Sequence, residues 1–431
     1  LSQMDTAPGE QSFTLKLSIM THQYDIAVLG GGLAGLSILY HLEKAGKLAG
    51  KRVLLVDPEG RKAAHDRTWS FWEIGEGPFE DLVYHRWKTV TVHDDERDVV
   101  RPLSQYEYKL IRSTEFYAHV NAVLDACPAI ERLQARAEDV TPQDRGVTFK
   151  AAGAAYRADL AFSSIPQHLR PRQIKQPYLD QHFRGWFITT DEDTFDPNQA
   201  ALMDFRTPQH GEPRFFYVLP FSKRKAMVEM AIFSNNHLRR EEYDALIQEY
   251  IAAYWTQGTY TIDHTEEGNI PMTSYPFTRR DRDLIYIGMP GGATRPSTGY
   301  TFYGLQRQLK RVTQDFPKLS NLRAWPRRHL MYDATLLRIL QENRLEGQKV
   351  FVDMFASNSA DLLFAFLNGE TTLRQEVSLM SSMNIPVFGK AFAQEMFNWG
   401  NEVLPEPSTF QAEANLVHST GSVEPRTRGA G

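Results

Sequence analysis

The chain has 431 residues but only one cysteine, Cys127, which excludes an intramolecular disulfide and any metal site built from cysteines. It also lacks an uninterrupted apolar run of the roughly 18 residues that a membrane-spanning helix requires. Its 48 basic and 53 acidic residues leave a formal charge of −5, which does not favour nucleic-acid partners. We therefore expect a protein of a reducing compartment, the cytoplasm, with no transmembrane helix.

The sequence also lacks the patterns of a metal site and of a signal peptide. No histidine cluster has the spacing of metal ligands, and no G-x-S-x-G motif is present, so we expect no metal. Residues 1–20 lack the cationic start and apolar block of a signal peptide, and we predict a disordered extension there. Met20 directly precedes the first predicted strand and is a candidate translation start. Residues 404–431, rich in Glu, Pro, Ser, Thr and Gly, are predicted to be a disordered tail.

What is present is a glycine-rich turn within "IAVLGGGLAGLSILYHL". Gly30, Gly32 and Gly35 satisfy G-x-G-x-x-G between a predicted strand and a predicted helix. Such glycines allow a tight turn, the approach of a pyrophosphate and close helix packing, while the helix N-terminus attracts the phosphates. Asp57 ends the next apolar run, where a carboxylate binds ribose hydroxyls and disfavours a 2′-phosphate. The pattern predicts binding of FAD or NAD rather than NADP.

A second glycine cluster, "DLIYIGMPGGATRPSTGYTFYGLQRQL", favours FAD. In flavoproteins a late strand, glycine turn and helix return to the cofactor, and simple NAD domains need no such return. The candidate contacts are Gly291, Gly292, Thr298 and Gly299. The aspartate common after the first glycine of such turns is replaced by Met289, which disfavours a generic monooxygenase.

The rest of the chain alternates between helical and strand-like residue patterns. Residues 109–124 read as helix, 146–166 as a hairpin returning to the sheet, and 181–232 as antiparallel strands. Helix is expected again at 239–256 and over most of 322–401. Residues 65–73 have no clear period and are dense in aromatics, and one interpretation is a loop near a ligand.

We predict an α/β fold in which a Rossmann-type FAD-binding domain is interleaved with an antiparallel β-sheet substrate domain. Residues 21–75, 95–165 and 270–320 are assigned to the first domain, and 76–94 and 166–269 to the second. A helical C-terminal part follows over 321–403.

Several motifs together resemble the lycopene cyclase family, bacterial β-cyclase type. They are "YDIAVLGGGLAGLS", "DRTWSFW", "GNIPM" and "GGATRPSTGYTF", in that order, with "MDF" and "VEMA" between them. The resemblance covers roughly residues 22–395 and implies an enzyme that closes β-ionone rings on linear carotenoids. It also implies reduced FAD with NAD(P)H as reductant, no net redox change, Arg67 at the cofactor, and peripheral contact with a membrane. Other carotenoid enzymes are further candidate partners.

Two departures from the family pattern stand out. The acidic motif usually has two adjacent acids, whereas here Met230 follows Glu229, and Arg295 stands where relatives often have histidine. The first casts doubt on any scheme that needs two neighbouring carboxylates, and the second removes a candidate proton carrier.

Ring closure needs a proton donor, and Glu229 is the leading candidate. It would share one strand face with apolar Met227, Ala231 and Phe233, where desolvation keeps a carboxyl protonated. The alternative is an edge-strand glutamate that faces water or pairs with a neighbouring basic residue. Second-rank candidates for the acid or base are Glu266, Glu267 and Asp204.

Aromatic and amphipathic segments complete the set of candidates. Trp69, Phe71, Trp72, Trp186 and Tyr300 are candidates to line the pocket and stabilise a cation, or to pack in the core. Residues 362–369 and 388–397 are amphipathic and suit a membrane surface, a pocket mouth or ordinary core helices. Two rival interpretations stay open: a redox flavoenzyme (a monooxygenase or an isoprenoid reductase) and a non-catalytic carotenoid carrier.

Overall fold

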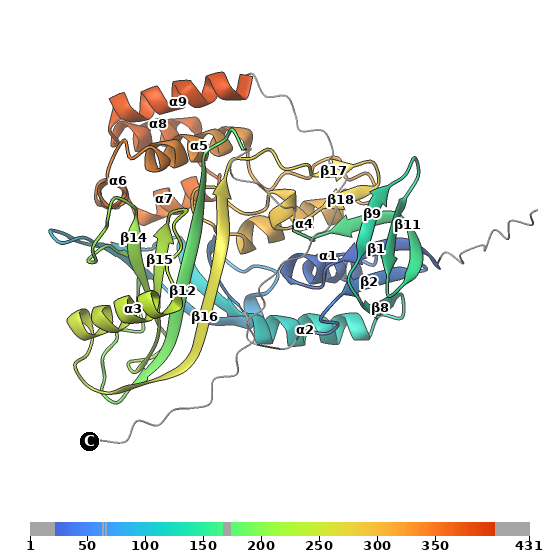
Figure 1. Ribbon diagram of the computed structural model, residues 1–431, viewed down its shortest axis with the longest axis horizontal. Helices are drawn as coiled ribbons and strands as arrows, with labels where there is room; N and C mark the ends of the chain where they lie inside the picture. The colour runs from blue at the N-terminus through green and yellow to red at the C-terminus, as the bar shows by residue number, and fades with distance from the viewer. Residues whose placement is uncertain (1–21, 63, 65–66, 167–173, 401–431) are drawn as a thin grey trace, which may run out of the picture.

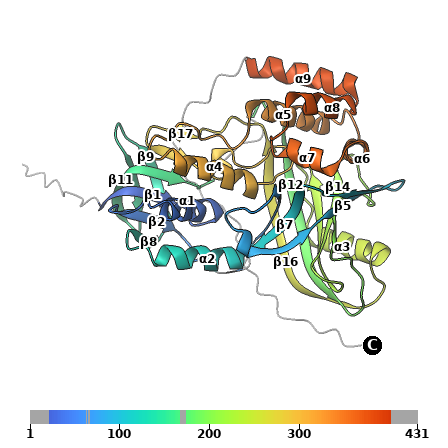
Figure 2. The same ribbon diagram turned by 180° about the vertical axis from the view of Figure 1, so that it is seen from behind.

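The computed structural model describes residues 22–400, apart from 63, 65–66 and 167–173. The predicted extension (1–20), the predicted tail (404–431) and Met20 lie outside the described residues. The fold is built from three β-sheets, and helices pack against each of them (Figures 1 and 2).

The first sheet has the strand order β17-β18-β11-β1-β2-β8, in which β18 to β8 are parallel and β17 is antiparallel. Strand β10 pairs antiparallel with β11, and β9 pairs antiparallel with β10. Helix α1 (Leu33–Lys44) packs against α2 (Ser113–Asp125) and α4 (Phe302–Gln314). All five residues of β2 are buried, as expected for a parallel strand covered on both faces. The strands are β1 (His22–Leu29), β2 (Val53–Asp57), β8 (Ile130–Gln134), β9 (Glu138–Pro142), β10 (Val147–Ala151), β11 (Ala154–Ser163), β17 (Arg280–Asp281) and β18 (Leu284–Tyr286).

The second sheet is mostly antiparallel, in the order β16-β12-β15-β14-β13-β5-β6. Helix α3 (Arg240–Tyr254) covers one face, and the opposite face packs toward the C-terminal helices. The strands are β5 (Thr89–His93), β6 (Asp98–Pro102), β12 (Tyr178–Thr190), β13 (Gln199–Asp204), β14 (Arg214–Pro220), β15 (Lys225–Phe233) and β16 (Tyr260–Thr273).

A small sheet of β3 (Thr68–Ile74), β7 (Tyr106–Arg112) and β4 (Val83–Trp87) joins these two parts. It corrects two predictions. Residues 68–73 form a strand, because each pairs with β7, although residues 67–70 do line a cavity. The helix predicted from 109 begins only at Ser113, since β7 runs to Arg112.

One domain boundary also differs from the prediction. Residues 95–102 were assigned to the FAD-binding domain, but β6 pairs with β5 in the second sheet. The reason is a hairpin: β6 lies antiparallel to β5 and follows it directly, so the two strands stay in one sheet. The predicted hairpin over 146–166 is present as β10 and β11.

The C-terminal helices gather at one edge of the molecule, with α8 and α9 outermost (Figures 1 and 2). They are α5 (Arg327–Gln341), α6 (Gly347–Ser357), α7 (Ala360–Leu367), α8 (Leu373–Ser381) and α9 (Ile385–Gly400). Among the described helices, none alone has the length and apolarity to cross a bilayer. Only α6 and α7 taken together reach that composition, and they are bent by 119° where they meet.

Candidate functional site

The glycine turn between β1 and α1 has the shape that a dinucleotide needs. Gly30 has φ +105°, which favours glycine, and a Cβ on Gly35 would lie 1.8 Å from the carbonyl oxygen of Gly30. A Cβ on Gly32 would meet nothing within 4 Å, so this residue leaves open space at the helix N-terminus. No side chain caps that terminus, and its first turn carries no acid. Its free N–H groups and positive dipole end therefore fit a pyrophosphate.

The second glycine segment reaches the same place from β18. Gly288 has φ +70° and packs against Ala34 of α1, and Gly299 has φ +74° beside Gln181 of β12. Between them Gly291 is pressed against the backbone of Tyr286, and Gly292 lies on the far side of the loop. Asp57 accepts hydrogen bonds from the backbone N–H of Gly31 at 2.6 Å and of Glu59 at 2.9 Å.

A cavity of about 750 Å³ extends from this glycine turn to the second sheet. Of the residues predicted to contact the cofactor, it is lined by Gly32, Arg67, Thr298 and Gly299. Gly30, Gly35, Asp57 and Gly291 instead shape the loops behind it, and Gly292 faces a different cavity. The open helix terminus and the glycine-lined walls fit FAD.

At the sheet end of this cavity, side chains from neighbouring strands form a row. Glu229 of β15 pairs in register with Gly185 of β12 on one side and with Tyr217 of β14 on the other. Gly185 pairs in turn with Glu266 of β16. Both glutamates and Tyr217 line the cavity. The structure thus brings together two carboxylates that are far apart in the sequence.

Gly185 allows this arrangement because it has no side chain. A Cβ there would lie 3.1 Å from Cβ and 3.2 Å from Oε2 of Glu229. Contacts this short are tighter than ordinary van der Waals packing. Glu229 therefore occupies the space that a side chain at 185 would fill, on the side that faces Glu266.

Burial determines the charge state of Glu229. It is 7% exposed, and it makes no ion pair with the residues that the structure describes. Burial, and secondarily the charge of Glu266, raise its pKa well above the ordinary value. The hydroxyl of Thr68 donates a hydrogen bond to Glu266. Glu229 is therefore suited to hold a proton near neutral pH.

Tyrosine hydroxyls adjoin this carboxyl. The hydroxyls of Tyr108 and Tyr300 lie 2.9 Å apart, and Tyr217 also bonds to Tyr300. Burial raises the pKa of Tyr108 to about 12, and it raises the pKa of Tyr300 well above its usual range. These phenols stay neutral at physiological pH and can donate or accept hydrogen bonds without adding charge.

A second cavity, of about 460 Å³, continues from the tyrosines under the C-terminal helices. The two cavities share Tyr217, Thr298 and Tyr300. Its walls are almost wholly apolar, and they include Phe233 of β15, Phe351 of α6, Phe364 of α7 and Phe388 of α9. A cavity of mixed lining that reaches the glycine turn and an almost wholly apolar cavity therefore meet beside Glu229.

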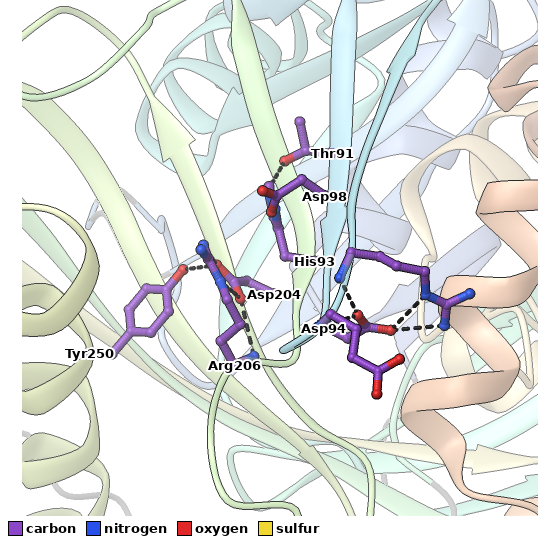
Figure 3. A network of polar contacts seen from close by, with 9 residues as sticks. Thr91, His93, Asp94, Asp98, Asp204, Arg206 and Tyr250 are labelled. Atoms are coloured by element: carbon purple, nitrogen blue, oxygen red, sulfur yellow. Dashed lines mark hydrogen bonds and ion pairs between the residues drawn. The ribbon is translucent and has the colours of Figure 1, made fainter.

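Two predicted catalytic residues lie elsewhere. Glu267 follows Glu266 on β16, so its side chain takes the opposite face, where it forms ion pairs with Arg184 at 3.0 Å and with Arg240. Asp204 is fully buried at the end of β13, bound by Arg206 and by the hydroxyl of Tyr250 at 2.6 Å (Figure 3). Neither side chain lines the cavity that Glu229 faces, so the structure does not bring these two predicted residues to it.

Some of the predicted aromatic residues line the cavities, and others lie away from them. Trp69 lines the dinucleotide cavity, Trp72 lines the apolar cavity, and Tyr300 lines both. Phe71 packs in the core against Phe302, and Trp186 lies on the opposite face of the second sheet.

Arg295, which stands where relatives often have histidine, is fully buried and anchors the "PSTGY" loop. Its Nε bonds to Asp333 of α5 at 3.0 Å, and the hydroxyl of Ser297 donates to the same carboxylate at 2.7 Å. Within the described part of the chain no cluster of His, Cys, Asp or Glu could hold a metal ion.

Sequence reasoning gave Glu266 and Glu267 the same second rank, and it missed Gly185, Tyr108 and Tyr217. A period-2 count along β16 separates the two glutamates but does not say which one faces inward. Pairing with β12 decides it, and that register depends on strands that are distant in sequence.

The chain was compared with known proteins. The family model described as "Lycopene cyclase protein" matches residues 25–392. A lycopene beta cyclase of Arabidopsis thaliana is 25% identical over 301 residues, which cover 64% of this chain and 56% of that protein. A neoxanthin synthase of Solanum tuberosum is 24% identical over 328 residues, which cover 69% of this chain and 63% of the synthase. The chain therefore matches less than two thirds of the length of these relatives.

Solved structures with this fold are flavoenzymes of several kinds. A geranylgeranyl bacteriochlorophyll reductase-like protein of Thermoplasma acidophilum has a TM-score of 0.56 at 13% identity, covering 86% of this chain and 98% of its own. A flavoprotein/dehydrogenase of Cytophaga hutchinsonii has a TM-score of 0.54 at 12% identity, covering 87% and 100%. At such identities the likeness shows the fold, and the predicted α/β architecture with a helical C-terminal part is confirmed.

The raised pKa of Glu229 predicts how stability changes with pH. Between the unfolded and folded pKa values the folded protein binds the extra proton, so its stability falls as pH rises through this window. Glu229→Gln removes that loss. Thermal unfolding from about pH 5 to 8 should show the variant gaining in Tm over the original protein as pH rises. A constant difference across this range would contradict the prediction, and Glu267→Gln serves as the control that gains nothing.

The close approach of Gly185 to Glu229 predicts an overpacking effect. Gly185→Val should lower the free energy of unfolding by about 1–3 kcal/mol, because the new side chain collides with the carboxyl. In a Glu229→Ala background the same change should cost much less, since the space is then vacant. Urea denaturation of the four proteins measures this coupling. Equal costs in both backgrounds would show that Gly185 is needed for another reason.

Proposed function

The chain belongs to the lycopene cyclase family, and we propose that it is a flavin-dependent lycopene β-cyclase. In this proposal it converts the linear ψ-ends of lycopene to β-ionone rings, giving γ- and β-carotene, without net redox change. The observation that carries the proposal is the position of the buried Glu229, whose pKa is raised by burial, beside the junction of a flavin-type cavity and an apolar cavity.

Ring closure begins when a proton adds to the terminal double bond of the polyene. The tertiary carbocation that forms is attacked by a nearby double bond, and loss of a proton places the ring double bond. Glu229 is the proposed acid, because its raised pKa keeps the proton available in an apolar site. Glu266, its neighbour across Gly185, is the proposed acceptor of the final proton.

The first cavity would hold FAD, with its phosphates at Gly32 and its remainder along Thr298 and Gly299. Reduced flavin, when bound, supplies negative charge near the developing cation, and NAD(P)H is the proposed reductant. The protein's own residues position the polyene and exclude water from it.

The apolar cavity suits the polyene chain. Near the junction the ring of Trp72 lies 4.4 Å from that of Tyr300 and 4.5 Å from that of Phe364. Such aromatic faces attract a cation while offering no base that would quench it early. The neutral tyrosine hydroxyls beside Glu229 can orient its carboxyl.

We further propose that α8 and α9 place the mouth of the apolar cavity on a membrane of the cytoplasmic side. Val377 and Ile385 line this cavity, yet they are 68% and 62% exposed. Leu373 and Met396 on the same helices are 66% and 56% exposed. Apolar side chains at the entrance of an apolar cavity suit a substrate that dissolves in lipid.

Electron counting tests the reaction type. Purified, FAD-loaded protein with lycopene in liposomes should give cyclic product anaerobically, using electrons only once to reduce the flavin. Glu229→Gln should lower turnover by about 10²-fold or more, as loss of a general acid does. The matched control, Glu267→Gln, should stay within about threefold because its side chain lies on the other face of β16. Electrons consumed in step with product would instead identify a redox flavoenzyme.

Vesicle binding tests the membrane surface. Leu373→Glu with Met396→Glu should weaken binding to phospholipid vesicles by about tenfold or more, because each buried apolar side chain is worth about 1.5–3 kcal/mol. Sedimentation with vesicles measures it in the absence of carotenoid. The control pair, Ile74→Glu with Ile262→Glu, replaces exposed apolar residues outside these helices and should leave binding unchanged. An equal loss in both pairs would refute this choice of surface.

A further inference from the structure

A third cavity, of about 380 Å³, lies behind the second glycine loop. Phe277 separates it from the dinucleotide cavity and lines both. Four of its lining residues are arginines, and no aspartate or glutamate lines it. The arginines are Arg279, Arg280, Arg323 and Arg327, and the neighbouring walls come from residues 273–278, Gly292, Thr294, Pro296, Leu330 and Trp399.

Hydrogen-bond donors in this arginine pocket lack partners. The buried Nε of Arg279, hydroxyl of Ser274 and indole N–H of Trp399 have no acceptor in the part of the chain that the structure describes. Arg280, in contrast, donates hydrogen bonds to the carbonyl oxygens of Arg282 and Lys318. Buried donors are almost always satisfied, so several unsatisfied donors around one cavity point to an acceptor that binds there.

The positive charge of the pocket is uncompensated. Burial, and then the charge of Arg323, lower the pKa of Arg279 to about 10. Burial and the charge of Arg327 lower the pKa of Arg323 in the same way. No carboxylate of the described residues forms an ion pair with Arg279, Arg323 or Arg327. An anion in the pocket would relieve this mutual repulsion.

Other arginines near this cavity behave differently. Arg295 is paired with Asp333 at 2.8 Å, and Arg328, next to Arg327, is paired with Glu376 at 2.9 Å. The chain therefore neutralises neighbouring arginines with carboxylates but leaves this group without one. A guanidinium fork matches phosphate oxygens in geometry and in charge.

We propose that the arginine pocket binds a phosphate group of an anionic ligand. Two kinds of ligand carry such a phosphate group: a nicotinamide dinucleotide that reduces the flavin, and an anionic phospholipid with its headgroup. The shared wall at Phe277 suits the first, because it places the pocket beside the dinucleotide cavity. Trp399 suits the second, because it belongs to α9. The phosphate site itself does not depend on the cyclisation proposed above.

The test measures binding to the full-length, FAD-loaded protein. The probes are inorganic pyrophosphate, NADPH, and phosphatidylglycerol vesicles compared with phosphatidylcholine vesicles. Calorimetry gives Kd for the soluble ligands, and sedimentation gives it for the vesicles. The variants are Arg279→Gln and the double variant Arg323→Gln with Arg327→Gln. The control is Arg136→Gln, which removes one exposed arginine outside the pocket.

Pyrophosphate should bind the original protein at least about tenfold more tightly than either pocket variant, as expected for losing charge-assisted hydrogen bonds. A parallel loss for NADPH alone identifies the dinucleotide as the source, and a loss for phosphatidylglycerol vesicles alone identifies the lipid. The variants should keep their flavin content and circular dichroism, since Arg323 and Arg327 are exposed. The proposal is overturned if no probe binds more weakly to the variants, or if Arg136→Gln weakens binding equally.

Discussion

The structure is organised around one costly constraint, the burial of a carboxyl group among apolar side chains. Glu229 lies within the second sheet and is largely buried, and this burial raises its pKa well above the ordinary value, which favours the protonated carboxyl. Gly185 on one neighbouring strand leaves room for the carboxyl, and Tyr217 on the other contributes a neutral hydroxyl. The sheet therefore holds a carboxyl of raised pKa at a defined point, at the expense of stability at higher pH.

The remaining architecture places two different cavities against this point. The first sheet and its glycine loops contribute to a cavity with an open helix N-terminus, which suits a dinucleotide. The C-terminal helices cover the second sheet and enclose an apolar cavity on the same side as Glu229. The loop with the sequence "PSTGY" (residues 296–300) lies between the two cavities. The buried ion pair of Arg295 and Asp333 holds this loop to α5. This pair couples the helical part to the loop at the junction.

Charge is neutralised wherever it has a purely structural role. Asp204 is satisfied by Arg206 and Tyr250, and Glu267 by Arg184 and Arg240 (Figure 3 shows the first group). Glu229 and the arginine pocket lack such compensation, one as an acid without a base and the other as bases without an acid. Ionisable groups left without such partners are typical of places where a ligand or a reaction supplies the balance, and the two proposals above rest on this.

The sequence by itself determined the glycine turn, the α/β architecture with a helical C-terminal part and, through its motifs, the family, because local spacing and chain order carry these features. It also gave Glu229 as the leading candidate for the acid. Tertiary structure decided which other side chains join Glu229. Glu266 rather than Glu267 faces the cavity, and Asp204 turns away, because strand pairing over long sequence distances sets which face each residue takes. The adjacent pair of acids expected for the family is absent from the sequence, but β15 and β16, which lie on either side of β12, place Glu229 and Glu266 across Gly185 from each other.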